Sequence, residues 1–260
     1  MTIGTNTALR RVEHHMGTAI TLAGDRISGE LADDFFARIS HLERMLSRFL
    51  PDSDLSRLAD GRVGLDEVDH SVREVVTRCA DLRVRTDGWF DHEPRREGRD
   101  ATRPVLDPNA FAKGWVVEQA AMELRLAGVP EFFVNAGGDV LVRRPHPYRV
   151  GIQHPLEPDA VVAVLELAEG AVATSGRYER GEHIRGSADR RVVSATVVGP
   201  DLGESDALAT AVIAAGQPVP GWWHRFAGCR ALLTVTSDGR IHWRLPDHDS
   251  LTHRTCRLVE

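Results

Sequence analysis

VLDPNAFAKGWVVEQAAMELRLAGVPEFFVNAGGDVLV, residues 105–142, joins a turn, a helix, a strand and a glycine pair in one unit. Asp107-Pro108 predicts a turn, because the proline ring fixes φ. The apolar residues that follow recur at helical spacing and predict an amphipathic helix: Phe111, Val116, Val117, Ala120, Ala121 and Leu124. Gly128, with a proline two residues later, marks the end of this helix.

A short apolar strand over 132–134 follows the helix and leads into Gly137-Gly138-Asp139, after which 140–142 are apolar again. Two adjacent glycines let a backbone approach a ligand closely and expose its N–H groups to phosphate. A plain hairpin turn explains the same residues, and the sequence leaves both interpretations open.

Lys113 is the single lysine of the chain. The other 31 of the 32 lysine and arginine residues are arginine. A sequence that uses arginine almost everywhere indicates that position 113 needs an ammonium. An ammonium is a compact charge with three donors and fits against a phosphate or carboxylate where a guanidinium does not. Alternatively, drift in the amino-acid composition left one lysine at this position by chance.

The composition is that of a globular protein: 260 residues, 42% hydrophobic and 27% charged. A formal net charge of −6 gives no reason to expect a nucleic-acid partner. Cys79, Cys229 and Cys256 match no zinc or redox spacing and fit a reducing compartment. We find no export signal, lipid-anchor cysteine or membrane-spanning run, and expect a cytoplasmic protein without a membrane anchor.

Further elements are expected on both sides of the central unit. Predicted strands are 11–22, 148–153, 160–167, 171–176, 192–198 and a terminal hairpin of 231–235 with 240–243; predicted helices are 31–50, ended by Pro51, 71–84 and 204–216. Residues 63–69 read as a linker or short strand, 221–223 as a loop with exposed tryptophans, and the last dozen residues as a polar tail. The elements do not alternate strictly and no GxGxxG follows a strand, so an α+β architecture is predicted.

Asp206 and Thr210 lie four residues apart on the last predicted helix, which puts both oxygens on one face. A hard divalent cation favours such ligands, and Mg²⁺ uses one or two carboxylates together with substrate phosphates and water. An aspartate that complements the helix dipole is the alternative.

Five blocks of the sequence, in this order, resemble the ApbE family of flavin transferases, which attach FMN from FAD to a Thr or Ser of a target protein through a phosphoester bond. The blocks are Met16-Gly17-Thr18, Gly88-Trp89-Phe90-Asp91, DPNAFAKGWVVEQAA with VNAGGDV, VATSGRYER, and ESDALATA. The resemblance implies a single domain over 1–260 with the T-fold-related architecture of mixed sheets flanked by helices. A flavin cleft would lie between two subregions.

The resemblance also implies roles for individual residues. FAD would contact Met16, Phe49, Phe90, Asp91, Asp107, Lys113, Glu118, Gly137, Gly138, Asp139, Thr174, Ser175, Gly176 and Ile184. Phe49 would lie against the isoalloxazine, although a core position is the alternative, and Glu118, where the family usually has Asp, would bind the adenosine ribose. The catalytic residues would be Lys113, Asp206 and His183, and Mg²⁺ would be held by the carbonyl of Ala110 with Asp206 and Thr210.

Two segments depart from the family pattern. Residues 92–96 read HEPRR where the family continues with Pro-Thr, and residues 185–189 read RGSAD where it has Asp-Pro and then Thr-Gly. Three functions therefore compete: an FMN transferase acting on a target flavoprotein with a Ser/Thr flavinylation motif, an Mg²⁺-dependent FAD pyrophosphatase, and a catalytically impaired FAD-binding protein.

Overall fold

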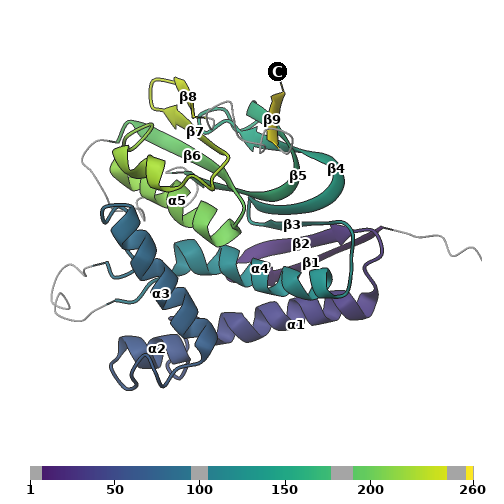
Figure 1. Ribbon diagram of the computed structural model, residues 1–260, viewed down its shortest axis with the longest axis vertical. Helices are drawn as coiled ribbons and strands as arrows, with labels where there is room; N and C mark the ends of the chain where they lie inside the picture. Colours follow the sequence, from purple (N-terminus) through teal and green to yellow (C-terminus); the bar gives the residue numbers. More distant parts are fainter. Residues whose placement is uncertain (1–7, 95–104, 177–189, 245–255, 260) are drawn as a thin grey trace, which may run out of the picture.

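The computed structural model describes residues 8–94, 105–176, 190–244 and 256–259, the last of these for the backbone only (Figure 1). The strands are β1 Leu9–His15, β2 Thr18–Gly24, β3 Phe132–Ala136, β4 Asp139–Gln153, β5 Val161–Gly176, β6 Val192–Gly199, β7 Ala231–Thr236, β8 Ile241–Arg244 and β9 Cys256–Val259. The helices are α1 Gly29–Met45, α2 Asp54–Ala59, α3 His70–Arg85, α4 Asn109–Leu126, α5 Leu202–Ala215 and the short 3₁₀ helix η1 Gly221–Arg225.

The described strands form one sheet in the order β1-β2-β3-β4-β5-β6-β7-β8, and β9 pairs with β5. All the pairs are antiparallel. Along the edge of β5 that faces away from β4, residues 164–167 pair with β9 and residues 171–176 pair with β6. The α+β class predicted from the sequence is confirmed, but the implied mixed sheets are a single antiparallel sheet in this part of the chain.

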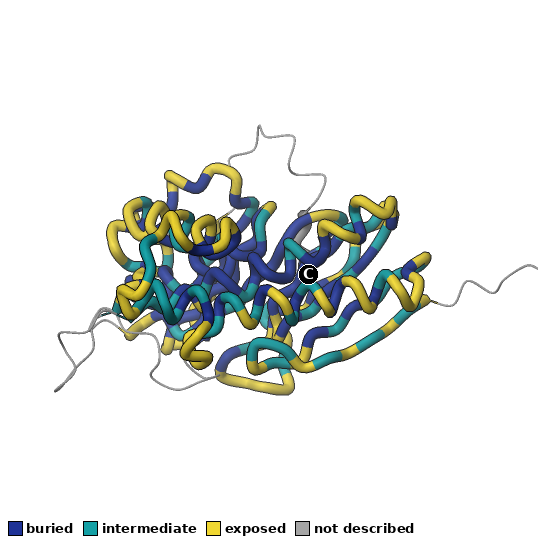
Figure 2. Tube along the Cα trace, turned by 90° about the horizontal axis from the view of Figure 1, so that it is seen from below, coloured by how far each residue is buried: buried dark blue, intermediate teal, exposed yellow. Residues whose placement is uncertain are grey.

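Two hydrophobic clusters lie on the two faces of the sheet. Successive residues of a strand point to opposite faces, so Ala171 and Ala173 of β5 join the large cluster with the helices, whereas Val172 joins a smaller cluster. The large cluster also contains the buried faces of α1, α4 and α5. Figure 2 shows buried segments concentrated in the middle of the molecule.

Helix α4 is the central helix and packs against both α1 and α5. The predicted helix is confirmed, but its predicted amphipathic character is wrong. Buried residues lie all around it, because other elements cover it on several sides: Phe111, Ala112, Gly114, Trp115, Val116, Val117, Ala120, Ala121 and Leu124.

The predicted strand over 11–22 is instead the hairpin β1–β2. Its turn is Met16-Gly17, with φ of 51° and 74°. Left-handed φ at both central residues suits the tight turn of a two-residue hairpin, which explains why a glycine stands at position 17.

Other predicted boundaries change in the structure. The first helix ends at Met45 rather than at Pro51, and Leu46 caps its end. Residues 63–69 form neither strand nor helix, which agrees with the predicted linker and excludes the short strand. The strands predicted within 140–153 and 160–176 are the two long strands β4 and β5.

Two predictions near the carboxyl end are wrong. Trp222 and Trp223 are buried in η1 rather than exposed in a loop. Within the predicted polar tail, β9 adds to the sheet. The predicted hairpin of β7 and β8 is confirmed.

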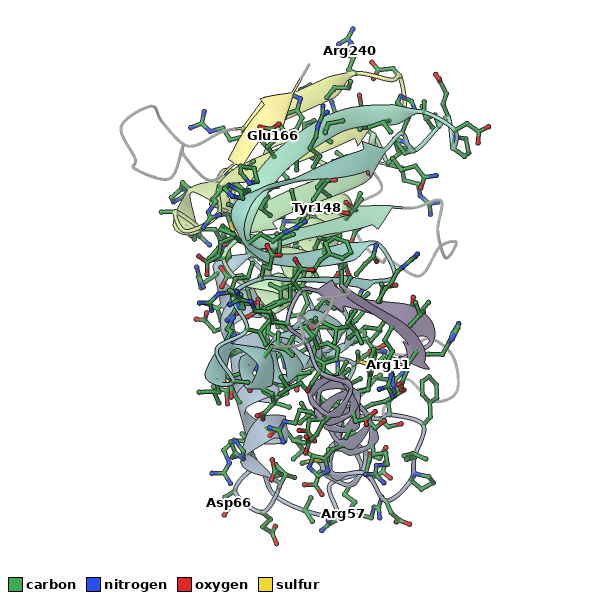
Figure 3. The ribbon with its side chains drawn as sticks, turned by 90° about the vertical axis from the view of Figure 1, so that its right-hand side faces the viewer. Arg11, Arg57, Asp66, Tyr148, Glu166 and Arg240 are labelled. Carbon is green, nitrogen blue, oxygen red and sulfur yellow. The ribbon has the colours of Figure 1, made fainter. Side chains whose placement is uncertain are left out.

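The helical and sheet parts of the molecule extend in opposite directions. Figure 3 shows Arg240 and Glu166 at one end, and Arg57 and Asp66, near α2, at the other. None of the helices in the described ranges has both the length and the apolar character needed to cross a membrane.

Candidate active site

A largely buried ammonium between two buried carboxylates forms the centre of the candidate site. Lys113, in the first turns of α4, donates a hydrogen bond to Oδ2 of Asp139, the first residue of β4. Its Nζ also lies 3.4 Å from Oδ2 of Asp206 on α5. The exposed fractions of the three side chains are 19%, 2% and 7%.

The two carboxylates of this triad decide the ionisation of Lys113. Burial lowers the pKa of Lys113, but Asp206 and Asp139 together outweigh burial and raise it above the ordinary value. Lys113 is therefore a cation at neutral pH.

Hydroxyl groups from β5 and α5 lie beside the triad. The backbone N–H of Thr174 donates to Oδ1 of Asp139 at 3.1 Å, which joins the end of β5 to the start of β4. Oγ of Ser175 lies 3.0 Å from Oγ1 of Thr210, one helical turn after Asp206. The structure thus brings together Lys113, Asp139, Asp206, Thr174, Ser175 and Thr210.

The oxygen atoms at this site fit the coordination of a hard cation that uses few protein ligands. No group of three or more His, Cys, Asp or Glu residues within 8–94, 105–176 and 190–244 could hold a metal ion. Asp206 and Thr210 share one face of α5, and Ala110 lies in the first turn of α4. Carboxylate, hydroxyl and carbonyl oxygens suit Mg²⁺, which keeps several waters and uses few protein ligands.

The glycine pair forms a hairpin turn between β3 and β4. The N–H of Gly137 donates to the carbonyl of Ala19 at 3.2 Å, and that of Gly138 donates to Oδ1 of Asn135 at 2.9 Å. Both N–H groups therefore have partners within the protein, so the hairpin alternative describes the turn. The cofactor roles of Gly137 and Gly138 stay predictions.

A second group of predicted residues surrounds the loop after α1. Phe49 is 79% exposed, so the core alternative is wrong. The guanidinium of Arg48 lies 5.0 Å from the centroid of its ring and also pairs with Asp107. The Met16 N–H donates to Glu43 Oε1 at 2.6 Å. An exposed aromatic ring next to a cation and a carboxylate could contact a planar ligand.

Phe90 and Asp91 differ in their surroundings. Phe90 is buried in the large cluster, and its N–H donates to Oγ1 of Thr86 at 3.0 Å. Asp91 forms an ion pair with Arg83 at 3.2 Å. In the altered segment after Asp91, the buried His92 stacks on Phe90, and burial lowers its pKa.

Glu118 lies between α4 and α5. Its Oε1 accepts a hydrogen bond from the N–H of Leu202, the first residue of α5, at 2.8 Å. Burial, followed by the charge of Asp201, raises the pKa of Glu118 to about 7. The predicted ribose contact remains a prediction, and at least one oxygen of the carboxylate already has a partner inside the protein.

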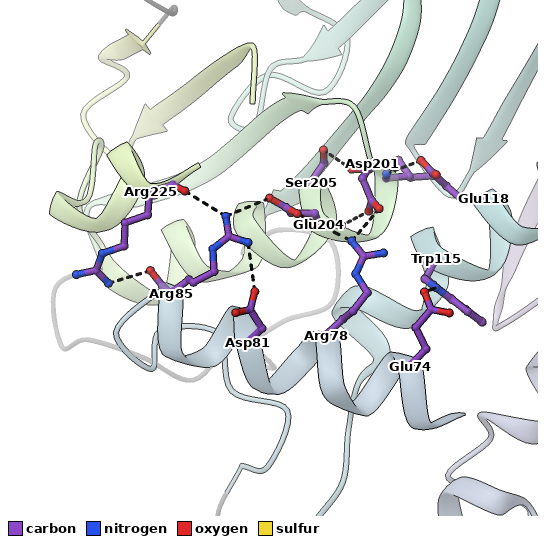
Figure 4. Close-up of polar contacts among 11 residues, drawn as sticks. Glu74, Arg78, Asp81, Arg85, Trp115, Glu118, Asp201, Glu204, Ser205 and Arg225 are labelled. Carbon is purple, nitrogen blue, oxygen red and sulfur yellow. Dashed lines mark hydrogen bonds and ion pairs between the residues drawn. The ribbon is translucent and has the colours of Figure 1, made fainter. Parts of the chain in front are cut away.

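Sequence reasoning missed several polar residues that organise the site. These are Arg48, Glu43, Thr196, whose hydroxyl lies 2.9 Å from that of Thr174, and Arg78 and Asp201, which pair at 2.8 Å (Figure 4). One signal was available: Asp201 stands three residues before Glu204, the spacing of a capping box. Its Oδ1 accepts from the Glu204 N–H at 2.7 Å.

Some predicted residues lie outside the described ranges. These are the predicted catalytic residue His183, the predicted FAD contact Ile184, the altered segment 185–189, and Arg95 and Arg96 of the other altered segment.

Comparison with curated proteins finds two relatives named FAD:protein FMN transferase. The one from Rhodobacter capsulatus is 38% identical over 154 residues, 52% of this chain and 29% of that protein. The one from Vibrio cholerae is 30% identical over 137 residues, 46% of this chain and 41% of that protein. The matched regions thus span less than half the length of either relative.

Solved structures share the fold. The flavin transferase ApbE from Vibrio cholerae superposes with a TM-score of 0.76 at 20% identity, over 93% of this chain and 97% of that one. The flavinyl transferase ApbE of Pseudomonas stutzeri gives 0.76 at 20% identity, over 95% and 97%. The model of the ApbE family matches residues 16–93 and 95–233. Because this match runs from the β1–β2 turn through the Lys113 triad to β7, the chain belongs to the ApbE family.

Proposed function

We propose that this chain is an Mg²⁺-dependent FAD:protein FMN transferase, which attaches FMN to a Thr or Ser of a target flavoprotein and releases AMP. The observation that carries the proposal is the Lys113 triad with its adjacent hydroxyls, in a member of a family with two relatives named for this activity. The target would carry a Ser/Thr flavinylation motif.

Lys113 would bind the pyrophosphate of FAD. An ammonium has three N–H donors; Asp139 takes one, and Asp206 lies within ion-pair distance of the Nζ. A phosphate oxygen could accept from the remaining donor. The two carboxylates keep Lys113 charged and limit its rotamers, so its charge is oriented before the substrate arrives.

The metal would be held by the carboxylate of Asp206, the hydroxyl of Thr210 and the carbonyl of Ala110. When bound, Mg²⁺ would neutralise the charge that accumulates on the phosphoryl oxygens. Ser175, hydrogen-bonded to Thr210, would orient its hydroxyl.

The reaction balances without a further reactant. The acceptor hydroxyl oxygen forms a bond to the FMN phosphorus, and the bond from that phosphorus to the bridging oxygen breaks. AMP leaves with the electron pair, and the hydroxyl proton is released. Such a step needs orientation and charge neutralisation more than covalent chemistry from the protein. His183 stays the predicted third catalytic residue.

The test measures AMP release and protein flavinylation together. Purified protein is incubated with FAD and Mg²⁺, with and without a carrier bearing the flavinylation motif, and in-gel flavin fluorescence is recorded. AMP with a fluorescent carrier supports the transferase. AMP with an unlabelled carrier would instead establish the pyrophosphatase, and bound FAD without AMP would establish a binding protein. Asp34→Ala, at an exposed carboxylate on α1, serves as a control for Asp206→Ala.

A further inference from the structure

We propose that Glu118 is a positioning residue, whose carboxylate on α4 holds the first turn of α5 and so sets the separation between Lys113 and Asp206. This inference rests on the proposed function and adds to it. It also differs from the ribose contact that the resemblance to the ApbE family implies for Glu118.

The first N–H groups of a helix have no partner within the helix, and other groups must satisfy them. At α5, Asp201 accepts from Glu204 as the N-cap. The N–H of Leu202 is satisfied from a different helix, by Glu118 at 2.8 Å. A carboxylate at a helix amino terminus also interacts favourably with the helix dipole.

The two helices are in backbone contact next to this hydrogen bond. A Cβ placed on Gly114 would lie 2.6 Å from the backbone N of Gly203 and from the carbonyl carbon and oxygen of Leu202. Glu118 is one helical turn beyond Gly114, on the same face of α4. The crossing and the hydrogen bond therefore fix α5 at two neighbouring points.

Two of the three triad residues are close in sequence to these two points. Lys113 precedes Gly114 on α4, and Asp206 comes three residues after Gly203 on α5. A shift of α5 along or away from α4 must change the 3.4 Å distance between Lys113 Nζ and Asp206 Oδ2. The same shift would move Thr210, one turn further along α5.

Helix α3 completes the support of this turn. Arg78 lies 2.8 Å from Asp201 and 3.9 Å from Glu204, and Arg85 lies 3.8 Å from Glu204 (Figure 4). These contacts hold the outer side of the turn, whereas Glu118 holds the side that faces α4.

Glu118 occupies an unfavourable place for a carboxylate. Burial and the neighbouring charge of Asp201 raise its pKa to about 7, and the Leu202 hydrogen bond and the charges of Arg125 and Arg78 only partly compensate. An apolar side chain would avoid this cost but would leave the Leu202 N–H without a partner. The carboxylate of Glu118 is therefore better explained by its effect on where α5 lies than by a contribution to the stability of the protein.

The experiment compares Glu118→Gln, which keeps an acceptor, with Glu118→Ala, which removes it. Glu118→Met, which fills the volume without an acceptor, replaces the alanine variant if that protein is insoluble. We expect Glu118→Ala to lower kcat by about 10- to 100-fold with little change in KM for FAD, since a displacement near 1 Å costs about that much. Glu118→Gln should stay within about threefold of the unmodified protein, because it restores the hydrogen bond.

Two further measurements separate positioning from the alternatives. Without any ligand, amide exchange at Leu202 should quicken in Glu118→Ala and not in Glu118→Gln. With an FAD analogue that lacks a hydroxyl on the adenosine ribose, the losses from the analogue and from Glu118→Ala should multiply. If the analogue costs the unmodified protein activity but costs Glu118→Ala nothing more, Glu118 contacts the ribose and the positioning role is overturned.

Controls keep the outcomes distinct. Ser28→Ala removes a comparable bond, from the Leu31 N–H to the N-cap of α1 at 3.1 Å, far along the chain from the triad. It should lower thermal stability without changing kcat; an equal loss of kcat in Ser28→Ala would overturn the proposal. If the unmodified protein releases no AMP, the proposed function fails, while unchanged Leu202 exchange in Glu118→Ala would refute the positioning role by itself.

Discussion

Replacing Gly114 by alanine tests how closely the geometry of the triad depends on the crossing of α4 and α5. The new Cβ would lie 2.6 Å from three backbone atoms, about 0.8 Å less than the 3.4 Å at which ordinary contact begins. Backbone atoms cannot rotate away as the end of a side chain can. The two helices must therefore separate by about that distance.

The energetic balance favours destabilisation. Overpacking a core costs about 1–3 kcal/mol, and alanine recovers about 1 kcal/mol through its higher helix propensity. The difference between these two terms predicts that Gly114→Ala lowers the free energy of unfolding by about 0–2 kcal/mol. The larger effect should be on catalysis, because a displacement near 1 Å at the triad costs about 100-fold in rate.

The assay is urea unfolding together with the kcat for AMP release. Gly29→Ala is the matched control, since Gly29 also lies in a helix but a Cβ there meets nothing within 4 Å. The control should keep its kcat and should lose no stability, because alanine meets no neighbour there and favours the helix. If Gly114→Ala kept kcat within twofold and unfolded like Gly29→Ala, the crossing would not set the triad geometry.

Three further predictions concern charged groups of the site. Asp206→Ala should abolish turnover but retain part of the FAD binding, measured by AMP release and flavin fluorescence quenching; undiminished Mg²⁺-dependent activity would contradict the metal assignment. Lys113→Arg should lower kcat by about 100-fold despite its charge, because a guanidinium cannot take the same place between two buried carboxylates; a fully active variant would show that an ammonium is not required. The folded-state pKa of Glu118, about 7, exceeds its unfolded value, so its contribution to stability is full below about pH 4 and is lost as the pH rises through 7. Relative to Glu118→Gln, the unmodified protein should therefore lose about 3 kcal/mol of unfolding free energy between pH 4 and 8 in urea titrations, and parallel curves would refute this.

Helices and strands whose bounds depend on neighbouring residues could be predicted from the sequence. Those whose bounds depend on pairing with residues far away in the chain could not. The helix α4 and the turn after it follow from spacing and end signals, whereas α5 begins at Leu202, two residues before its predicted start. For β4 the sequence predicts two separate strands, 140–142 and 148–153, and Pro145 and Pro147 lie between them. In the structure they lie at an irregularity of the β4–β5 pairing, between Arg143 and Tyr148, where a proline removes no ladder hydrogen bond.

The site shows the same division. Lys113 and Asp206 could be singled out, one as the sole lysine and the other from its place on a helix face. The hydrogen bond between Glu118 and Leu202 joins residues 84 apart, and that between Arg48 and Asp107 joins residues 59 apart. No local pattern encodes such pairs, because they depend on how the helices and the sheet pack.

The pairing of β2 with β3 has a consequence for how the chain folds. Residues 25–131 separate the two strands, and α1 to α4 lie within this interval. An isolated hairpin such as β1–β2 is only marginally stable in water, and closing a long loop costs entropy before the contacts form. During synthesis the β1–β2 hairpin can therefore pair with β3 only after α1 to α4 have been synthesised. We predict slow folding that is limited by the pairing of β2 with β3.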